Sequence, residues 1–364
     1  MRTLLTTVLL IFFSSFVYAG SNELESEKNT KFNPTEKVLH HIQDAHDWHL
    51  WGDVSIPLPI IFYIEGEIDF FMSSVFHHND DGTYIHETNG RRYVKYHGDI
   101  YQLNTGADGL LFDPLDTEHK NGPTNAVKRS HTTADFSMTK NIAAMIFSVL
   151  VLFLILRATA LGYKKHKSPR GIQAFLEPLI LFVRDDIVKL NIGKKYKKFT
   201  TFLLTVFFFI LINNLLGLLP GAANVTGNIS VTLVLSFFTF IMVTISANKG
   251  YWMHIVKPPG TPIPLLPIMI PIEVFGIFTK PFALMIRLFA NITAGHIIIL
   301  SLISLIFVAS NNGENVVAGY SVAPVSMLFV LFIYLIEVLV AFLQAYIFTL
   351  LSAVFIGLAV KDAH

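Results

Sequence analysis

The chain changes from polar to apolar about a third of the way along its length. Residues 20–135 are rich in His, Asp, Asn and Gly, whereas continuous apolar sequence begins near residue 142. We place a first transmembrane helix at residues 137–163. Residues 199–248 contain no Asp, Glu, Lys or Arg, and a turn at Leu219-Pro220-Gly221 divides them into two further spans, which predicts a transmembrane hairpin.

The last apolar region, residues 265–360, consists of two tracts separated by the polar segment 311–315. Each tract exceeds the roughly 20 residues that cross a bilayer, so we expect both helices to tilt or to lie partly along the membrane. The pattern therefore predicts an all-α integral membrane bundle of about five transmembrane helices. The last two are expected to pair as a long, tilted antiparallel hairpin.

The first 19 residues have the features of an export signal. Arg2 precedes an apolar run of signal-peptide length, and Val17-Tyr18-Ala19 provides small residues for cleavage before Gly20. We favour a cleavable signal peptide at residues 1–19 because the run is short for a span. An uncleaved first transmembrane helix is the alternative.

Cleavage would leave residues 20–136 as an exported, periplasmic domain. Residues 60–68 and 92–103 carry aromatic and β-branched side chains between turn signals such as Asn89-Gly90. These features predict strands, and so a small domain that contains β structure.

The most basic loop is residues 164–198, with lysines clustered at both ends. The positive-inside rule places this loop and the basic loop 249–264 in the cytoplasm, which agrees with an exported N-terminal domain and puts the C-terminus in the cytoplasm. Residues 172–190 have apolar positions at helical spacing between charged ones. They predict an amphipathic helix at the membrane interface.

Composition agrees with a membrane protein, since 52% of the 364 residues are hydrophobic and only 15% are charged. The absence of cysteine excludes disulfides, iron–sulfur clusters, thiolate zinc sites and a cysteine nucleophile. No GxxxxGK[ST] loop occurs, so the chain does not bind nucleotide by that means. The net charge of +1 gives no indication of nucleic acid. We expect no cofactor and no metal.

Few charged residues interrupt the last apolar region. Between Pro281 and Val360 they are Arg287, Glu314 and Glu337, of which Glu314 lies in the polar segment. Buried ionisable residues normally face a bundle interior or a water-filled path. Two plainer alternatives stay open: Arg287 could snorkel to the interface, and Glu337 could be protonated and hydrogen-bonded.

Antiparallel pairing about the segment 311–315 brings these residues together. In such a hairpin the residue numbers of two facing residues add up to twice the centre of the turn, about 626 to 632. Arg287 and Gln344 add up to 631, and His296 and Glu337 add up to 633. Asn291 follows Arg287 by four residues and shares its helix face. A paired imidazole and carboxylate suit a proton relay, whereas a guanidinium does not deprotonate and acts as a fixed charge.

Three ordered motifs resemble the a subunit of F-type ATP synthases over roughly residues 137–360. They are Thr279-Lys280-Pro281 followed by Arg287-Leu288-Phe289-Ala290-Asn291 and Ala294-Gly295-His296; Leu343-Gln344-Ala345-Tyr346-Ile347-Phe348; and Asn214-Leu215-Leu216-Gly217-Leu218-Leu219-Pro220. The resemblance implies the stator half of a proton channel in the cell (inner) membrane.

The resemblance also implies residue roles. Arg287 would be the essential charge facing the carboxylate of a c-subunit ring, with Gln344 and Asn291 close to it. The aqueous half-channels would be lined by His296, Glu337, Asn213 and Asn214 on the outer side and by Glu273 on the cytoplasmic side. Implied partners are the c ring, the b subunits of the peripheral stalk, membrane lipid and, indirectly, the F1 sector, with no nucleic acid.

Some features depart from the family pattern. His296 and Glu337 exchange the acid and the histidine found in some members, but the pairing is kept, which favours protons over sodium. Some members have an acid at the position of Gly217, so the outer path differs here. The family supplies no role for residues 20–135, where His40, His41, His46 and His49 suggest a metal site less readily than an ordinary folded surface.

Two other functional classes fit the buried charges. One is a proton-coupled secondary transporter, which should show repeat symmetry and a substrate cavity that the sequence does not reveal. The other is a membrane scaffold whose charges only pair helices, and which would tolerate loss of Arg287. The motifs favour the ATP synthase subunit over both.

Overall fold

The computed structural model describes residues 44–51, 54–77, 79–104, 106–107, 109–112, 123–128, 134–165, 171–219, 222–257, 262–311 and 313–360. The predicted signal peptide, residues 1–19, and His40 and His41 lie outside this range. The chain forms two compact units, one containing residues 1–144 with the short segments 219–223 and 307–316, and one containing the remainder. The first unit is mostly β and the second is helical.

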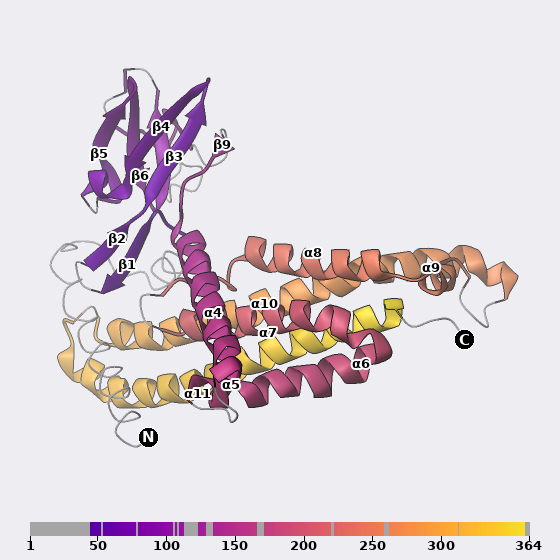
Figure 1. Cartoon of the computed structure of the whole chain (residues 1–364). Coiled ribbons are helices and arrows are strands. Elements are labelled where there is room, and N and C mark those ends of the chain that lie inside the picture. The colour runs from indigo at the N-terminus through magenta and orange to yellow at the C-terminus, as the bar shows by residue number, and fades with distance from the viewer. Residues whose placement is uncertain are drawn as a thin grey trace. The chain divides into compact units, whose positions relative to one another are not determined.

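The β unit consists of antiparallel strands in three small sheets, drawn in indigo and purple in Figure 1. One sheet pairs β1 with β2, the second has the order β4-β3-β9, and the third has the order β5-β6-β7-β8. The strands are β1 (Asp47–Trp51), β2 (Val54–Pro57), β3 (Pro59–Ile64), β4 (Glu67–Met72), β5 (Asp81–Thr88), β6 (Arg91–Tyr96), β7 (Asp99–Leu103), β8 (Ala126–Lys128) and β9 (Ala134–Asp135), with a 3-10 turn, η1 (Ser73–Phe76), after β4.

Two-residue turns explain where the sequence prediction of single strands needs revision. Residues 60–68 form not one strand but β3 and β4, joined at Glu65-Gly66, and residues 92–103 are divided at His97-Gly98. Both turns, like Asn89-Gly90, have positive φ at both residues, as in a type I′ hairpin turn. Glu-Gly and His-Gly are less typical of such turns than Asn-Gly, which is why they were not recognised.

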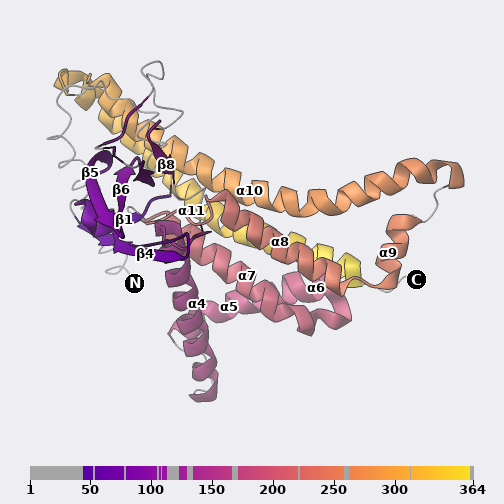
Figure 2. The ribbon, with the colours of Figure 1, turned by 90° about the horizontal axis from the view of Figure 1, so that it is seen from above.

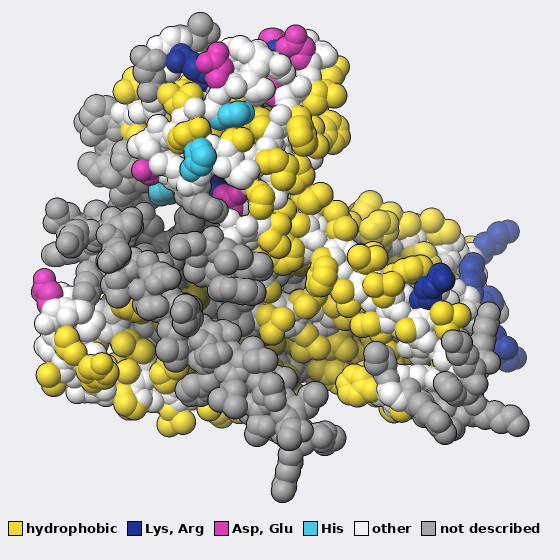
Figure 3. Space-filling model, turned by 60° about the vertical axis from the view of Figure 1, so that its left-hand side comes forward, with side chains coloured by type: hydrophobic (Ala, Val, Ile, Leu, Met, Phe, Trp, Pro, Cys, Tyr) yellow, Lys and Arg dark blue, Asp and Glu magenta, His cyan; other side chains and the backbone are white. Residues whose placement is uncertain are grey.

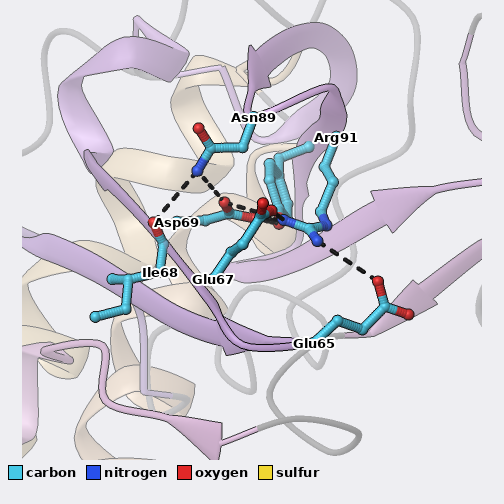
Figure 4. A network of polar contacts seen from close by, with 7 residues as sticks. Glu65, Glu67, Ile68, Asp69, Asn89 and Arg91 are labelled. Carbon is cyan, nitrogen blue, oxygen red and sulfur yellow. Dashed lines mark hydrogen bonds and ion pairs between the residues drawn. The ribbon is translucent and has the colours of Figure 1, made fainter.

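A buried carboxylate ties the second and third sheets of the β unit together. Asp69 on β4 is fully buried and accepts hydrogen bonds from the Tyr93 hydroxyl, from Asn89 Nδ2 at 2.6 Å and from Arg91 at 3.3 Å (Figure 4). Tyr93, itself fully buried, stacks on Phe62 in the core of the unit. The three donors stabilise the carboxylate in place of water.

Replacing Tyr93 with Phe removes one of these donors and leaves Asp69 short of a partner. We expect a loss of about 1–3 kcal/mol in the free energy of unfolding of this unit. Resistance of the unit to proteolysis in the full-length membrane protein, measured against denaturant, checks this. Tyr63→Phe is the control because the Tyr63 ring is half exposed. Equal resistance of the two variants would contradict the stabilising role.

The helical unit begins within α4 (Lys140–Lys165) and continues as a nearly unbroken helical segment from residue 172 to 217. Its further elements are α5 (Ile172–Leu181), the π-helix η2 (Phe182–Lys189), α6 (Leu190–Ile192), η3 (Gly193–Lys195), α7 (Tyr196–Gly217), α8 (Ile229–Ser246), α9 (Lys249–Val256), η4 (Ile263–Leu265), α10 (Leu266–Ala309) and α11 (Val316–Val360). Helices α7, α8, α10 and α11 run roughly alongside one another in both views (Figures 1 and 2).

Five helical segments among the described residues are long and apolar enough to cross a membrane: Lys140–Tyr163, Gln173–Gly217, Ile229–Ser246, Leu266–Ala309 and Val316–Val360. This confirms the predicted membrane bundle with a small β-containing N-terminal unit. Helices α10 and α11, with 44 and 45 residues, are about 66 Å long, against about 30 Å of bilayer hydrocarbon. They therefore lie oblique to the membrane or extend beyond it.

Helix α7 is the centre of the helical core. Its buried side chains, such as Phe199, Leu203 and Phe207, pack with Val183 and Ile187 of η2 and with the C-terminal half of α11. The predicted amphipathic segment, residues 172–190, is thus helical and buries one face on α7. Its placement at the membrane interface stays a prediction.

A close approach in the core depends on a glycine. A Cβ added at Gly357 of α11 would clash with the backbone carbonyl oxygen of Asn191 in α6 and lie 3.6 Å from the Cα of Ile192. Because the obstacle is backbone, it cannot turn aside as a side chain would. The two helices therefore reach this separation only with glycine at position 357.

We expect Gly357→Ala to separate α6 from α11 and to cost about 1–3 kcal/mol of stability. Gly276→Ala in α10 is the matched control, since a Cβ there meets nothing within 4 Å. Both changes raise helix propensity, so only the clash distinguishes them. Thermal unfolding of the two variants in detergent, followed by circular dichroism, measures the difference. Equal melting temperatures would show that the contact is not required.

Candidate functional site

The predicted hairpin of α10 and α11 is antiparallel, and two contacts give its register. The Ser326 hydroxyl donates a hydrogen bond to the Leu302 carbonyl, and the Glu337 carboxylate packs against the Cα of Gly295. These pairs have index sums of 628 and 632, within the range predicted from the sequence. This register puts Arg287 of α10 opposite the part of α11 that carries Gln344, and His296 opposite the part that carries Glu337.

The Glu337 carboxylate occupies the space that Gly295 leaves open by having no side chain. A Cβ at position 295 would collide with Oε1 and would lie 2.7 Å from Cδ of the carboxylate. Glu337 is only 7% exposed, and its Oε2 is buried without a hydrogen-bond partner among the described residues. His296, the next residue on α10, is partly buried. A carboxylate in this state needs water or a proton.

Helix α7 is tied to α11 between Glu337 and Gln344. Asn214 Nδ2 donates to the carbonyl of Ala341 at 3.1 Å, and Asn214 Oδ1 accepts from the Thr226 hydroxyl at 2.7 Å. Gln344, 4% exposed, lies one turn beyond Ala341, while Glu337 lies one turn before it. Asn214 thus fixes the part of α11 that carries both side chains.

Other polar groups lie at the end of α7 and in the loop after it. Asn213 is buried and donates to the Phe209 carbonyl at 2.8 Å, but its Oδ1 and the Nδ2 of Asn224 have no hydrogen-bond partner among the described residues. The Tyr334 hydroxyl donates to the Leu218 carbonyl, so this bond and that of Asn214 join the end of α7 to α11 on either side of Glu337. We call these residues the polar region around Glu337; ordered water can satisfy such unpartnered atoms.

Sequence analysis missed three members of this region: Thr226, Asn224 and Tyr334. Tyr334 precedes Glu337 by three residues and so shares its helix face, which is a signal that the spacing contains. Thr226 and Asn224 lie in the loop after α7, and no periodicity indicates which of the polar residues of that loop turn inward.

Arg287 and Asn291 differ from the other predicted residues because both are exposed on the surface of α10. Exposed apolar side chains, Phe282 at 58% and Ile286 at 43%, lie around them. On the face of the helical unit that Figure 3 shows, hydrophobic side chains cover much of the described surface, and lysine and arginine gather at one end. The guanidinium therefore points away from the chain's own core.

Glu273 lies 14 residues before Arg287 on α10, about 21 Å along the helix. It is partly buried. Burial, and then the negative charge of Glu273, raises the pKa of Tyr251 on α9. Midway between the two, Lys280 lies over the ring of Phe355 on α11, with Nζ 5.6 Å from the ring centroid. The structure thus separates Glu273 from the polar region around Glu337.

The suggested histidine metal site receives no support from the described residues. His46 is buried and its Nδ1 lies 3.1 Å from the Gly98 carbonyl, as for a histidine that holds a loop. Among the described residues no group of three or more His, Asp or Glu side chains is placed to hold a metal ion.

Comparison with known proteins identifies a family for most of the helical unit. The family model described as ATP synthase A chain matches residues 142–357, and a domain family of unknown function, DUF8433, matches residues 37–126. ATP synthase subunit a of Chloroherpeton thalassium is 49% identical over 234 residues, 62% of this chain and 67% of the relative.

Two further relatives cover a similar part of the chain. ATP synthase subunit a 2 of Chlorobaculum tepidum is 49% identical over 241 residues, 63% of this chain and 66% of the relative. ATP synthase subunit a of Myxococcus xanthus is 44% identical over 237 residues, 63% of this chain and 75% of the relative. The chain belongs to the ATP synthase A chain family, and it is a multi-pass membrane protein of the proton-translocating Fo sector without catalytic activity of its own.

Proposed function

We propose that this chain is the stator wall of the proton path, with two aqueous half-channels that meet a c-subunit ring on either side of Arg287. The observation that carries the proposal is a contrast in exposure. Arg287 is exposed on α10, whereas Glu337 and Gln344 on α11 are buried. One ionisable group thus faces a partner, and the other lies inside the chain.

A guanidinium left facing lipid costs at least a few kcal/mol, so an exposed Arg287 at membrane depth calls for a partner with negative charge. Three exposed alanines, Ala283, Ala290 and Ala294, flank it along α10. Small side chains allow a partner helix to approach closely. A c-subunit helix with an ionised carboxylate satisfies both conditions.

The outer half-channel follows the buried polar region around Glu337. Asn213 Oδ1 and Glu337 Oε2 are buried without a hydrogen-bond partner among the described residues. Asn214 is next to Asn213 on α7, and His296 is next to Gly295, against which the Glu337 carboxylate packs. Water there would connect the outside to Glu337, whose carboxylate can accept and release a proton. Residues 20–136 would lie on this outer side.

The inner half-channel lies near Glu273. The lysine-rich segment 194–198, with Lys249 and Lys257, supports a cytoplasmic position for this end of the helical unit by the positive-inside rule. The C-terminus of α11 would be cytoplasmic as well. The b subunits of the peripheral stalk would hold the chain against rotation, and the F1 sector would carry the ATP chemistry.

The mechanism is then an exchange of protons with a moving site. A proton passes from the outer water through the His296 and Glu337 region to a c-subunit carboxylate, which becomes neutral and can turn through lipid. On arriving near Arg287 from the other side, the site releases its proton to the path at Glu273. Arg287 stabilises only the ionised carboxylate, so a protonated site does not cross directly between the two paths.

Replacing Arg287 with Ala should abolish ATP synthesis driven by a proton gradient and raise passive proton leak, because nothing then separates the half-channels. Arg287→Lys should also fail to couple, since a buried lysine loses its proton and lacks the fork geometry. Membrane vesicles given an imposed gradient measure both quantities.

The matched control is Arg157→Ala, an arginine that is likewise exposed on a membrane helix but lies eight residues from the basic end of α4. It can snorkel to the interface and should be dispensable for coupling. ATP synthesis at the wild-type rate by Arg287→Ala vesicles would contradict the proposal.

Glu337→Gln keeps the shape of the side chain but cannot carry a proton. We expect passive proton flux through Fo to fall on the order of 100-fold, the lower end of what a positioned proton-transfer group contributes. Gly295→Ala should slow flux too, because its Cβ displaces the carboxylate. Glu314→Gln, in the turn between α10 and α11, is the control. Unchanged flux in Glu337→Gln vesicles would remove this residue from the path.

A further inference from the structure

Four lysines surround a cavity of about 430 Å³ in the helical unit. Its lining consists of Lys194, Lys195, Lys197, Lys198, Phe199, Ser246, Asn248 and Val360, which we call the lysine basin. The four lysine side chains are exposed, whereas Phe199 is buried and forms an apolar wall. The volume is within the range of about 300–1,000 Å³ of small-molecule sites.

Three helix ends form the lysine basin. Helix α7 begins at Tyr196, α8 ends at Ser246 and α11 ends at Val360, and each belongs to a segment long and apolar enough to cross a membrane. Ends of spanning helices lie at the level where hydrocarbon gives way to lipid head groups. Helix α8, with 18 residues, just spans the hydrocarbon, so its end at Ser246 would put the basin at head-group depth.

The positive charge of the basin exceeds what the helix ends need. The last carbonyls of α11 are already satisfied, since Asn248 N donates to Ala359 at 2.8 Å and Asn248 Nδ2 donates to Val360 at 2.7 Å. Lys195 Nζ lies 3.4 Å from the Val360 carbonyl as well. None of the described residues that line the cavity is acidic. The remaining lysines repel one another unless an anion lies between them.

We propose that the lysine basin binds the phosphate head group of an anionic phospholipid. The ammonium groups would contact the phosphate, and the lipid would join the ends of α7, α8 and α11. Lysines close to the membrane surface attract anionic lipid individually, and a cavity that gathers four of them holds one head group in place.

The test counts bound lipid on the intact ATP synthase. The complex is exchanged into nanodiscs of phosphatidylglycerol and phosphatidylcholine, and retained phosphatidylglycerol is measured by native mass spectrometry. The double variant Lys194→Gln, Lys198→Gln should bind phosphatidylglycerol about 30-fold more weakly. Each lysine near a membrane surface strengthens binding of an anionic lipid by about fivefold. Lys194→Arg with Lys198→Arg should retain the lipid, because the charge is kept.

The matched control is Lys249→Gln with Lys257→Gln, which removes two charges from the same end of the helical unit outside the basin. Equal loss of lipid in both glutamine pairs would overturn the proposal, since the attraction would then be general. Absence of retained phosphatidylglycerol from the wild-type complex, together with binding of inorganic phosphate that the glutamine pair abolishes, would overturn it in favour of a free-phosphate site. Unchanged proton flux in the Lys194→Gln, Lys198→Gln variant would keep this result separate from the role of Arg287.

Discussion

The cost of holding a charge at membrane depth is the constraint on which this structure depends. The chain carries a guanidinium on one apolar helix and a carboxylate on another, and the two groups differ in exposure. Glu337 is enclosed by a glycine of α10 and by polar groups at the end of α7, whereas Arg287 is turned outward. A buried carboxylate can be neutralised by a proton, but a guanidinium keeps its charge and so needs a negative partner. Glu337 can therefore be buried, whereas Arg287 has to face a partner.

The rest of the helical unit supports this arrangement. Helix α7 is buried in the core and bonds α11 at Ala341, so the helix that carries Glu337 and Gln344 is fixed from behind. Helix α10 packs few of its side chains and leaves a long face open. A rigid inner layer and an open outer helix suit a wall along which another body moves. The close approach at Gly357 joins α11 to α6 at the other end of the same inner layer.

Sequence alone predicted much of this and missed the rest for identifiable reasons. Five apolar helices and the register of α10 with α11 follow from hydrophobic runs and from the few charges within them. The outward position of Arg287 was expected only from the family resemblance, because periodicity shows which residues share a face and not which face is covered. The hairpins at Glu65-Gly66 and His97-Gly98 lack a strong turn signal. The lysine basin needs three helix ends that are distant in sequence, and its lysines were interpreted only as an orientation signal.

The open face of α10 also has a consequence for the chain before assembly. A newly inserted copy would present Arg287 and its apolar surroundings to lipid, where the guanidinium draws water and head groups inward and thins the bilayer around it. Under the proposed function a c-subunit ring would cover this face, so the exposure of Arg287 favours incorporation of the chain into a complex in which the ring is already present.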